Sequence, residues 1–506
     1  MAPVQLDSNL LLLSVVFVVS CFAIVRNVWS RHNRSLPPSP PALPIIGNLH
    51  QLGRRHYHRN LQALARRHGP LFLLRLGSVP TLVVSSASVA EEVLRTQDHV
   101  FCGRPPQRAA RGLLYDCRDV AFSPYGERWR QLRRIAAVRL LSAKRVDSFR
   151  ALREQEVASF LDRIRSAGAD GVNVSELLVG LTYAVISKAA FGNKLGWMEP
   201  GAVRAMTRET SDLLETIAVG DVFPRLRWVD WATGLDERIE RAAGKLDAVL
   251  EGALREHEKG AGGGGDDGEA GDLLDDLLLA VKEGGAGLNL DRTDVKGLII
   301  DLFLAGTDTT SNTMEWTMAE LVKNPSEMEK VQAEVRQVVG QHGSVVTEEK
   351  LSAMTRLQAA MKEALRLHPP APMLVPREVV HDTKLHGYDI PAKTRVLVNA
   401  WAIGRDDKSW GQDADAFRPE RFVQSAGIDY SGKDSRFIPF GAGRRGCPGI
   451  GFGTRLAELA LANMLYHFDW ELPDGQDVDS FEVVESSGLS AGLKCPLTLA
   501  PKPLRA

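Results

Sequence analysis

Cysteine is scarce in this sequence, and the few cysteines lie far apart. Five occur among 506 residues, namely Cys21, Cys102, Cys117, Cys447 and Cys495. The sequence holds no CxxC pair and no cysteine–histidine ladder with zinc spacing, which argues against a disulfide framework and a structural zinc site. The cysteines are therefore predicted to be reduced thiols in a protein that faces the cytosol, and at least one needs a separate explanation.

An excess of charge of either sign is also lacking. The formal net charge is −1, which gives no reason to expect nucleic acid as a partner. The chain has no internal repeat and no strong linker in its body, so we expect one large domain despite the length. A composition that is 44% hydrophobic and 25% charged suits a globular protein with a large core.

The N-terminal segment differs from the rest of the chain. Leu10–Val25 is apolar apart from two serines, and arginines follow it at Arg26, Arg31 and Arg34. We expect residues 1–29 to be a transmembrane anchor, and arginines after the apolar run place the body in the cytosol. A cleaved signal peptide is the alternative. It is disfavoured because the first nine residues hold no Lys or Arg and no small-x-small cleavage site follows.

Residues 30–47 are predicted to be a basic, proline-rich hinge. Five prolines fall within eight residues, from Pro37 to Pro44, and such a segment is stiff and extended because proline cannot join a helix. The hinge would hold a catalytic domain, residues 48–506, close to a membrane surface.

The body is predicted to be mainly α with small β-sheets. Apolar, β-branched runs indicate a hairpin over Leu71–Leu76 and Thr81–Ser85, and a short strand over Val396–Asn399. Helical periodicity marks residues 127–141, 205–218, 292–323, 326–339, 356–367 and 453–468. Gly260–Gly271, with four consecutive glycines, is predicted to be a flexible surface loop.

The segment Phe440–Gly449 is the most informative part of the sequence. Pro448 suits the first position of a helix, which would place Cys447 at a helix N-terminus, where backbone N–H groups favour thiolate. Arg445 can offer a cation to an anionic ligand. A thiolate with hydrogen bonds to sulfur is how proteins tune haem iron.

Two other interpretations of this loop exist. A lone cysteine is often a small buried apolar residue. The loop also contains GxGxxG, from Gly441 to Gly446, the fingerprint of dinucleotide binding. That fingerprint needs a preceding strand and a βαβ unit, whereas Pro439 disfavours the strand and only some sixty residues follow.

The middle of the predicted helix Asp291–Lys323 contains a weakening motif, residues 305–310 (AGTDTT). Gly306 costs about 1 kcal/mol relative to Ala, and adjacent threonines compete for backbone carbonyls and can locally open the helix. A cleft for a small ligand is one explanation. The alternative is an ordinary buried helix whose threonine hydroxyls bond to carbonyl groups.

Two further pairs of residues share helix faces. Glu363 and Arg366 are spaced i, i+3, which is common for a surface ion pair. Trp129 and Arg133 bring an indole N–H and a guanidinium together, both donors suited to a carboxylate. A solvated basic helix is the alternative for the second pair and its neighbours Arg128, Arg130, Arg134, Arg139, Lys144 and Arg145.

The pattern F-x-x-G-x-R-x-C-x-G, at Phe440, Gly443, Arg445, Cys447 and Gly449, resembles the haem-binding signature of the cytochrome P-450 superfamily. The resemblance covers essentially the whole chain and is closest to plant microsomal members, in the group of geraniol and diterpene hydroxylases. One departure is Gly446, where related plant enzymes usually carry a larger residue.

The resemblance implies a haem-thiolate monooxygenase fold that binds haem b, with Cys447 as the axial ligand of the iron. By the same resemblance Asp308 and Thr309 deliver protons to dioxygen. Haem contacts are implied for Trp129, Arg133, Arg445, Arg377, Arg104, Phe440, Gly441 and Ala305. Glu363 and Arg366 join Arg421 in a structural network near the cysteine loop.

The substrate pocket is also expected from the resemblance. Its candidates are the loop Pro105–Phe122 and the residues Asp301, Leu302, Ala305, Met373, Leu374, Gly488 and Leu489. Most are apolar, which favours a lipophilic substrate. Asp301 shares a helix face with Ala305 and Thr309 and could hold a substrate hydroxyl; a satisfied buried acid is the alternative.

The reaction implied is insertion of one oxygen atom from O₂ into a C–H bond of a lipophilic molecule, a terpenoid by resemblance. Electrons would come from NADPH through a separate reductase, at the endoplasmic reticulum membrane, with one membrane pass and a cytosolic catalytic domain. Oxidation of a phenolic or another metabolite, a haem-thiolate isomerase or dehydratase, and a non-catalytic haem sensor are the alternatives.

Overall fold

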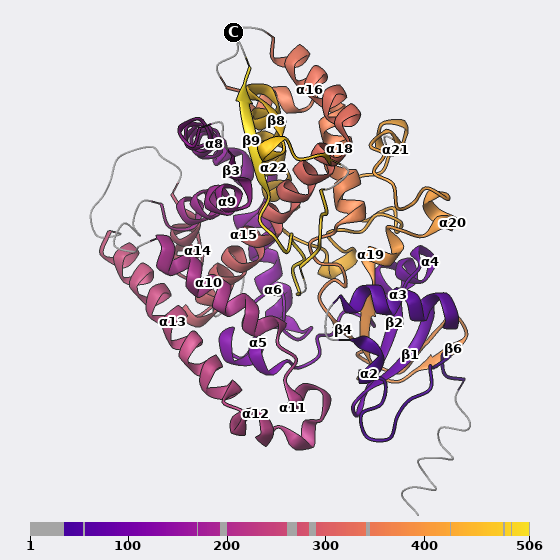
Figure 1. Ribbon diagram of the computed structural model, residues 1–506. Helices are drawn as coiled ribbons and strands as arrows, with labels where there is room; N and C mark the ends of the chain where they lie inside the picture. Colours follow the sequence, from indigo (N-terminus) through magenta and orange to yellow (C-terminus); the bar gives the residue numbers. More distant parts are fainter. Residues whose placement is uncertain are drawn as a thin grey trace, which may run out of the picture.

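The computed structural model describes residues 35–53, 56–168, 171–192, 200–260, 271–282, 290–340, 345–425, 427–478, 481–486 and 488–504. The predicted anchor (1–29), the first part of the hinge (30–34) and most of the glycine-rich loop (261–270) lie outside these residues. The rest is mainly helical with small sheets, as predicted (Figure 1).

Helices make up most of the described chain. In chain order they are α2 Leu49–Leu52, α3 Tyr57–His68, α4 Ala87–Glu91, α5 Arg108–Leu113, α6 Glu127–Ile135, α7 Ala143–Ser148, α8 Arg150–Ser166, α9 Val174–Phe191, α10 Pro200–Glu215, α11 Val219–Val222, α12 Trp228–Ala232, α13 Leu235–Gly260, α14 Leu273–Lys282, α15 Arg292–Lys323, α16 Pro325–Val339, α17 Glu348–Leu351, α18 Thr355–Leu367, α19 Ala400–Ile403, α20 Asp407–Trp410, α21 Glu420–Gln424 and α22 Ile450–His467.

The largest sheet has four strands in the order β1 (Leu71–Leu76), β2 (Val79–Val84), β7 (Arg395–Val398) and β4 (Arg377–Glu378). The predicted hairpin is present, but its second strand begins two residues earlier than predicted, so that Pro80 lies inside β2. This position is tolerated because β7 pairs with β2 only from Thr81 onward, so the proline faces no partner strand on that side.

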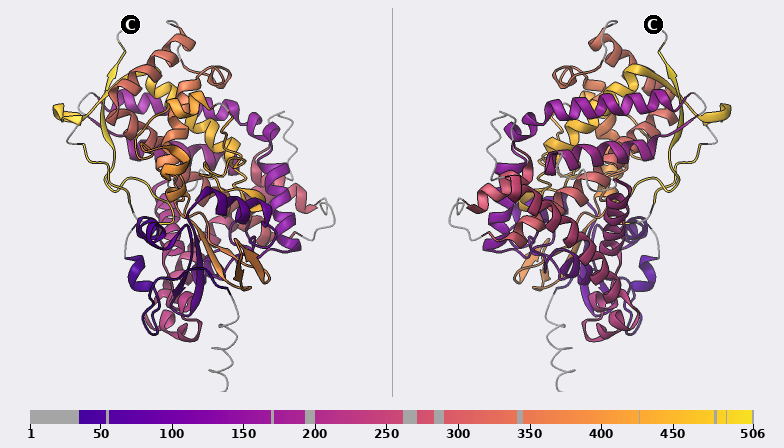
Figure 2. Two further views of the ribbon diagram at one scale, coloured as in Figure 1. Left: turned by 90° about the vertical axis from the view of Figure 1, so that its right-hand side faces the viewer. Right: turned by 90° about the vertical axis from the view of Figure 1, so that its left-hand side faces the viewer.

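Two smaller sheets complete the β-structure. One has the order β3 (Val172–Asn173), β9 (Thr498–Pro503) and β8 (Phe468–Glu471), and the other pairs β5 (Thr383–Leu385) with β6 (Tyr388–Ile390). The β9 sheet lies at the opposite end of the molecule from the β1–β2 sheet (Figures 1 and 2).

The long helix α15 is the centre of the helical core. It begins where Asp291 forms a capping box, accepting from the N–H groups of Thr293 and Asp294 at 2.9 and 3.0 Å. It ends at Asn324, because Pro325 starts α16. Helices α9, α18 and α22 pack around it, so its middle lies inside the protein.

Each of the six predicted helical segments is present, with differences at some ends. The α-helix α6 stops at Ile135 and continues as a π-helix over Ala136–Leu140. Helix α22 begins at Ile450, with Gly449 as its N-cap. Pro448 therefore precedes the N-cap and does not occupy the first helical position, so that prediction was wrong.

Among the described residues, one helix is long and apolar enough to cross a membrane, α9. More than half of it is buried inside the protein, and it packs along α15. Helix α9 is therefore a helix of the core.

Candidate functional site

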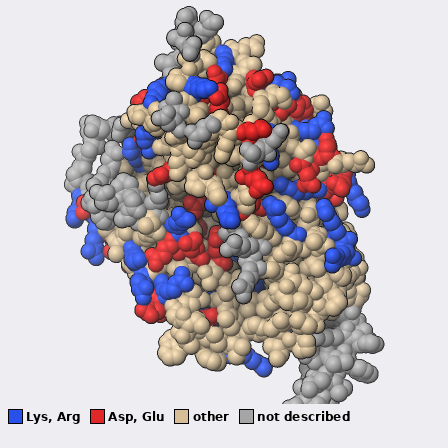
Figure 3. Space-filling view, in the orientation of Figure 1, with Lys and Arg blue, Asp and Glu red and all other residues tan. Residues whose placement is uncertain are grey.

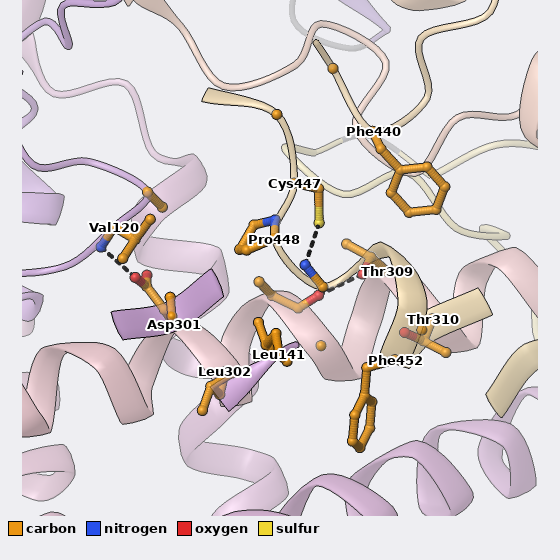
Figure 4. Close-up of a pocket in the computed structure, with 18 of the residues that line it drawn as sticks. Val120, Leu141, Asp301, Leu302, Thr309, Thr310, Phe440, Cys447, Pro448 and Phe452 are labelled. Carbon is orange, nitrogen blue, oxygen red and sulfur yellow. Dashed lines mark hydrogen bonds between the residues drawn. The ribbon is translucent and has the colours of Figure 1, made fainter. Parts of the chain in front are cut away.

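A cavity of about 300 Å³ lies between the cysteine loop and the middle of α15 (Figure 4). Cys447, Phe440 and Gly441 line it from the loop, and Ala305 and Thr309 line it from the helix. The motifs found at residues 305–310 and 440–449 thus meet at one site, although about 130 residues separate them in the chain.

The backbone of the cysteine loop depends on glycine at two positions. Gly441 and Gly443 have φ of 67° and 70°, values that other residues rarely adopt. A Cβ at Gly443 would also lie 2.0 Å from the carbonyl oxygen of Leu94. The Cys447 N–H donates to the Phe440 carbonyl oxygen at 2.9 Å, which closes the loop and turns the sulfur toward the cavity.

The sulfur of Cys447 accepts a hydrogen bond from the Gly449 N–H at 3.3 Å, as a site just before a helix predicts. Burial nevertheless raises the pKa of the Cys447 thiol, and the lowering effects of the Gly449 N–H and the Arg133 charge are smaller. The protein alone therefore does not favour the thiolate; a bound metal cation would supply the missing stabilisation.

Helix α15 passes the cavity without a break. The Thr309 hydroxyl donates to the Ala305 carbonyl oxygen at 2.5 Å, and Thr307 bonds in the same way to Phe303 at 2.8 Å. The predicted opening of the helix does not occur: these two hydroxyls bond to carbonyls one turn back while the helix continues, as in the alternative of an ordinary buried helix. Thr309 still lines the cavity, as does Gly306 beside it.

Asp308 lies next to Thr309 in sequence but does not line the cavity. Its carboxylate accepts a hydrogen bond from the Ser211 hydroxyl of α10 at 3.3 Å. Burial raises the pKa of Asp308, partly offset by that hydrogen bond and by the charge of Arg208. The two residues of the predicted proton-delivery pair thus face different sides of α15.

Three of the predicted haem-contacting arginines are held by protein groups. Arg104 donates to the carbonyl oxygens of Ala121, Val375 and Pro376, and Arg377 donates to Asp98 and Ala442. Arg445 bonds to three backbone carbonyls and lies over the ring of Trp129, 4.2 Å from its centroid. The Trp129 N–H itself donates to Val120 at 3.0 Å. All four line the cavity.

Arg133 is different, because it lines the cavity and its side chain has no hydrogen bond or ion pair with any described residue. Burial lowers its pKa, and the Cys447 side chain is the charge that opposes this. Burial lowers the pKa of Arg445, which lines the same side of the cavity, to about 10. The charges of Arg377 and Arg133 lower it further. A cation-rich rim with an unpaired arginine suits a cofactor that carries carboxylates.

The substrate-pocket candidates divide into two groups. Leu302, Ala305 and Leu374 line the cavity. Met373 does not; it is buried in a cluster with residues of the β1–β2 sheet. Gly488 and Leu489 are also outside the lining. Gly488 lies close to Glu215 of α10, and Leu489 packs on the main core.

Asp301 lines the cavity, but its carboxylate is turned toward Val120 (Figure 4). Its Oδ2 accepts from the Val120 N–H at 2.5 Å.

The predicted Glu363–Arg366–Arg421 network also forms. Glu363 and Arg366 bond through two contacts of 2.8 Å, and Arg421 Nε donates to Glu363 at 3.3 Å.

Several lining residues were not predicted from the sequence. They come mostly from helices with no recognised motif and include Leu141, Ile186, Leu273, Phe452 and Leu456. Ile186 belongs to α9, a helix that is apolar on nearly all sides, so no pattern marks the face that meets the cavity. Phe452 and Leu456 follow the cysteine loop closely, and their nearness to it was the one available signal.

A cysteine loop and a long helix facing one largely apolar cavity, with arginines along its rim, define a haem-thiolate protein. A family model described as cytochrome P450 matches residues 37–491. The chain is 49% identical to cytochrome P450 71A1 of Persea americana over 461 residues, covering 90% of this chain and 91% of the relative. It is 41% identical to an indoleacetaldoxime dehydratase of Arabidopsis thaliana, covering 92% and 93%.

Solved structures agree with these matches. A zebrafish cytochrome P450 solved with abiraterone superposes with a TM-score of 0.75 at 28% identity, over 89% of this chain and 99% of that one. The chain belongs to the cytochrome P450 family. It is a haem monooxygenase like the plant members, and its cofactor is protohaem with an axial cysteine thiolate.

Proposed function

We propose that this monooxygenase hydroxylates a lipophilic small molecule of the terpenoid class, with Cys447 as the thiolate ligand. The observation that carries the proposal is that Cys447 and Thr309 line the same cavity from opposite elements. The walls between them are mostly apolar, and apolar pockets of this kind bind small molecules chiefly by removing their surface from water.

The chain's own residues would divide the work of the site. The Gly449 N–H holds the sulfur of Cys447, and Arg133 is placed to pair with a haem carboxylate. The bound haem supplies oxygen activation, while the protein supplies its ligand, a dry cavity and protons. Thr309 lines the cavity with its hydroxyl, and Asp308, held by the Ser211 hydroxyl on the α10 side of the helix, would exchange protons with solvent.

We propose a separate NADPH-dependent reductase as the electron donor. Of the basic residues around α6, Arg128, Arg130 and Arg145 pair with carboxylates of this chain. Arg134 and Lys144 remain exposed and are suited to an acidic partner surface. Charge reversal at both should lower reductase-supported turnover with haem content unchanged; loss of haem as well would contradict the docking role.

Membrane attachment at the endoplasmic reticulum, with the body in the cytosol, is also part of the proposal. Its support is an apolar surface formed by Leu43, Ile45, Ile46, Leu226, Trp228 and Trp231, with Ile45 77% and Trp231 74% exposed. These residues come from two segments, around residues 43–46 and 222–231, and the β1–β2 turn contacts both. The Gly77 N–H donates to the Ile46 carbonyl oxygen, and the Ser78 N–H donates to that of Val222. This end of the molecule shows few charged side chains (Figure 3), as a surface resting on lipid needs.

A second candidate is a dehydratase reaction on the same haem, because one relative is an indoleacetaldoxime dehydratase. The experiment that separates the two supplies the purified enzyme with reductase and tests terpenoids, phenolics and aldoximes, each with and without NADPH and O₂. Terpenoid products that carry one added oxygen and require both support the proposal. Turnover of an aldoxime with loss of water and no oxygen incorporation would replace it.

A further inference from the structure

The buried carboxyl group of Asp119 lies against that of Asp301. Asp119 belongs to the loop between α5 and α6, has no exposed surface, and accepts from the Phe122 N–H at 2.7 Å through Oδ2. Its Oδ1 has no N–H or O–H donor among the described residues. The group that faces it is the Asp301 carboxyl, and each of the two side chains acts on the pKa of the other as a hydrogen-bonding neighbour. Two carboxyl groups can bond in this way only when they share a proton.

We propose that Asp301 is a positioning residue: it and Asp119 share one proton, and this pair fixes the loop that carries Val120 and Ala121 in the cavity wall. Asp301 then acts on substrate choice through the loop, without touching the substrate. This part of the inference rests on the proposed function, whereas the loop contact itself does not.

The hydrogen bonds of Asp301 support this role. Its Oδ2 accepts from the Val120 N–H at 2.5 Å, and the Ala121 N–H lies close enough to lower the pKa of the carboxyl. Both residues line the cavity. A carboxyl group engaged by two loop amides and a second carboxyl has little capacity left for a substrate hydroxyl.

The loop also sits directly on α15 one turn before Asp301. A Cβ at Gly297 would lie 1.9 Å from the carbonyl oxygen of Arg118, so only glycine permits this approach. Gly297 and Asp301 are spaced i, i+4 and share a helix face. The helix therefore packs against the loop backbone at Gly297 and accepts a hydrogen bond from it at Asp301.

The loop needs such anchors because it contains a left-handed turn. Tyr115, Asp116 and Cys117 have φ of 51°, 57° and 62°, a conformation that costs L-residues roughly 1–2 kcal/mol each. The Tyr115 hydroxyl donates to Asp247 at 2.7 Å, which holds the start of the turn. The Asp119–Asp301 pair holds its end.

The proton of the pair makes the anchor sensitive to pH. Burial and the Asp119 charge raise the pKa of Asp301 well above its usual value. Burial also raises the pKa of Asp119, but there the Phe122 N–H and the Arg104 charge oppose it. Cys117 and Arg445 are further titratable groups that interact with the pair. The proton therefore resides on Asp301, and its loss at alkaline pH would place two like charges in contact.

The test compares Asp301→Asn with Asp301→Ala in the full-length holoenzyme. Asparagine keeps both functions of the protonated acid, since its oxygen accepts from Val120 and its amide donates to Asp119. We expect the Asn variant to retain the product profile and slow hydrogen exchange of residues 118–123. We expect the Ala variant to exchange this segment about tenfold faster, from loss of buried hydrogen bonds, and to give altered products.

A direct substrate contact by the carboxylate predicts the reverse, an altered product profile in Asp301→Asn with exchange unchanged, and this result would overturn the proposal. Asp119→Asn provides a second variant should Asp301→Ala fail to fold, because it too supplies a permanent hydrogen to the pair. Both Asn variants should melt above the wild type at pH 9 and nearly alike at pH 4, because the unfolded chain releases this proton near the ordinary pKa of aspartate, about 3.9. Equal melting at both pH values would show that no proton is shared. The melting and hydrogen-exchange measurements do not depend on the class of substrate.

Discussion

Glu363 and Arg366 form a bidentate ion pair in which neither side chain has any exposed surface. The guanidinium of Arg366 also donates to the carbonyl oxygens of Gly404, Ala414 and Ala416. Helix α18 is thereby joined to the chain that leads toward the cysteine loop. The pair has a structural role, since neither residue lines the cavity.

Replacing Arg366 by leucine should destabilise the protein by about 3–5 kcal/mol, because the charge of Glu363 would be left buried without its partner. Thermal unfolding followed by circular dichroism measures this. Arg241→Ala breaks the exposed pair with Glu237 and serves as the control, with an expected loss below about 1 kcal/mol. Equal effects of the two substitutions would contradict the structural role.

Thr309→Ala should lower product formation on the order of 10²-fold while NADPH consumption continues, because the cavity loses the hydroxyl that the proposal assigns to proton transfer. The ratio of product formed to NADPH consumed is the measurement. Thr307→Ala removes an equivalent hydroxyl that bonds to Phe303 and does not line the cavity. A fall in the ratio for both variants would point to a helix defect.

Arg133→Gln should weaken haem binding roughly 10- to 100-fold, since a charge-assisted hydrogen bond contributes about 1.5–3 kcal/mol. The rate of haem transfer to an excess of apomyoglobin reports this loss. Arg134→Gln, the exposed neighbour on the same helix, should leave the rate unchanged. Equal transfer rates for wild type and Arg133→Gln would remove Arg133 from the cofactor site.

The motifs of the site could be read from the sequence because each is a local pattern with a local physical cause. The glycines of the cysteine loop and the cap of α15 act within a few residues of the feature that they produce. The bonding of Asp301 could not be read in this way. It depends on a left-handed turn without glycine, over Tyr115–Cys117, and on a contact across 181 residues.

The same limit applies to the rim of the cavity. Arg104 bonds to carbonyls of Val375 and Pro376, more than 270 positions away. Its residue type predicts a cation at the site, but only the packed structure shows that protein groups already hold it. Arg133 has the same residue type as Arg104, and only the structure shows that it lines the cavity without a hydrogen-bond partner among the described residues.

Glu458 should make stability depend on pH. Burial raises its pKa to about 7, so the folded protein binds more protons than the unfolded chain above the ordinary pKa of glutamate. Stability should therefore fall as pH rises from about 4.5 to about 7 through this group. Melting at a series of pH values should show that Glu458→Gln gains over wild type at pH 8 and equals it at pH 4. The exposed Glu349→Gln is the control, and a gain there as large would contradict the assignment.

The ligation of haem by Cys447 is tested most directly by the absorption spectrum of the dithionite-reduced protein under carbon monoxide. Wild type and the exposed-cysteine control Cys495→Ala should both show the strongly red-shifted Soret band of a thiolate ligand, and Cys447→Ala should lack it. A histidine-type band in the wild type, or a red-shifted band that persists in Cys447→Ala, would contradict ligation by this cysteine.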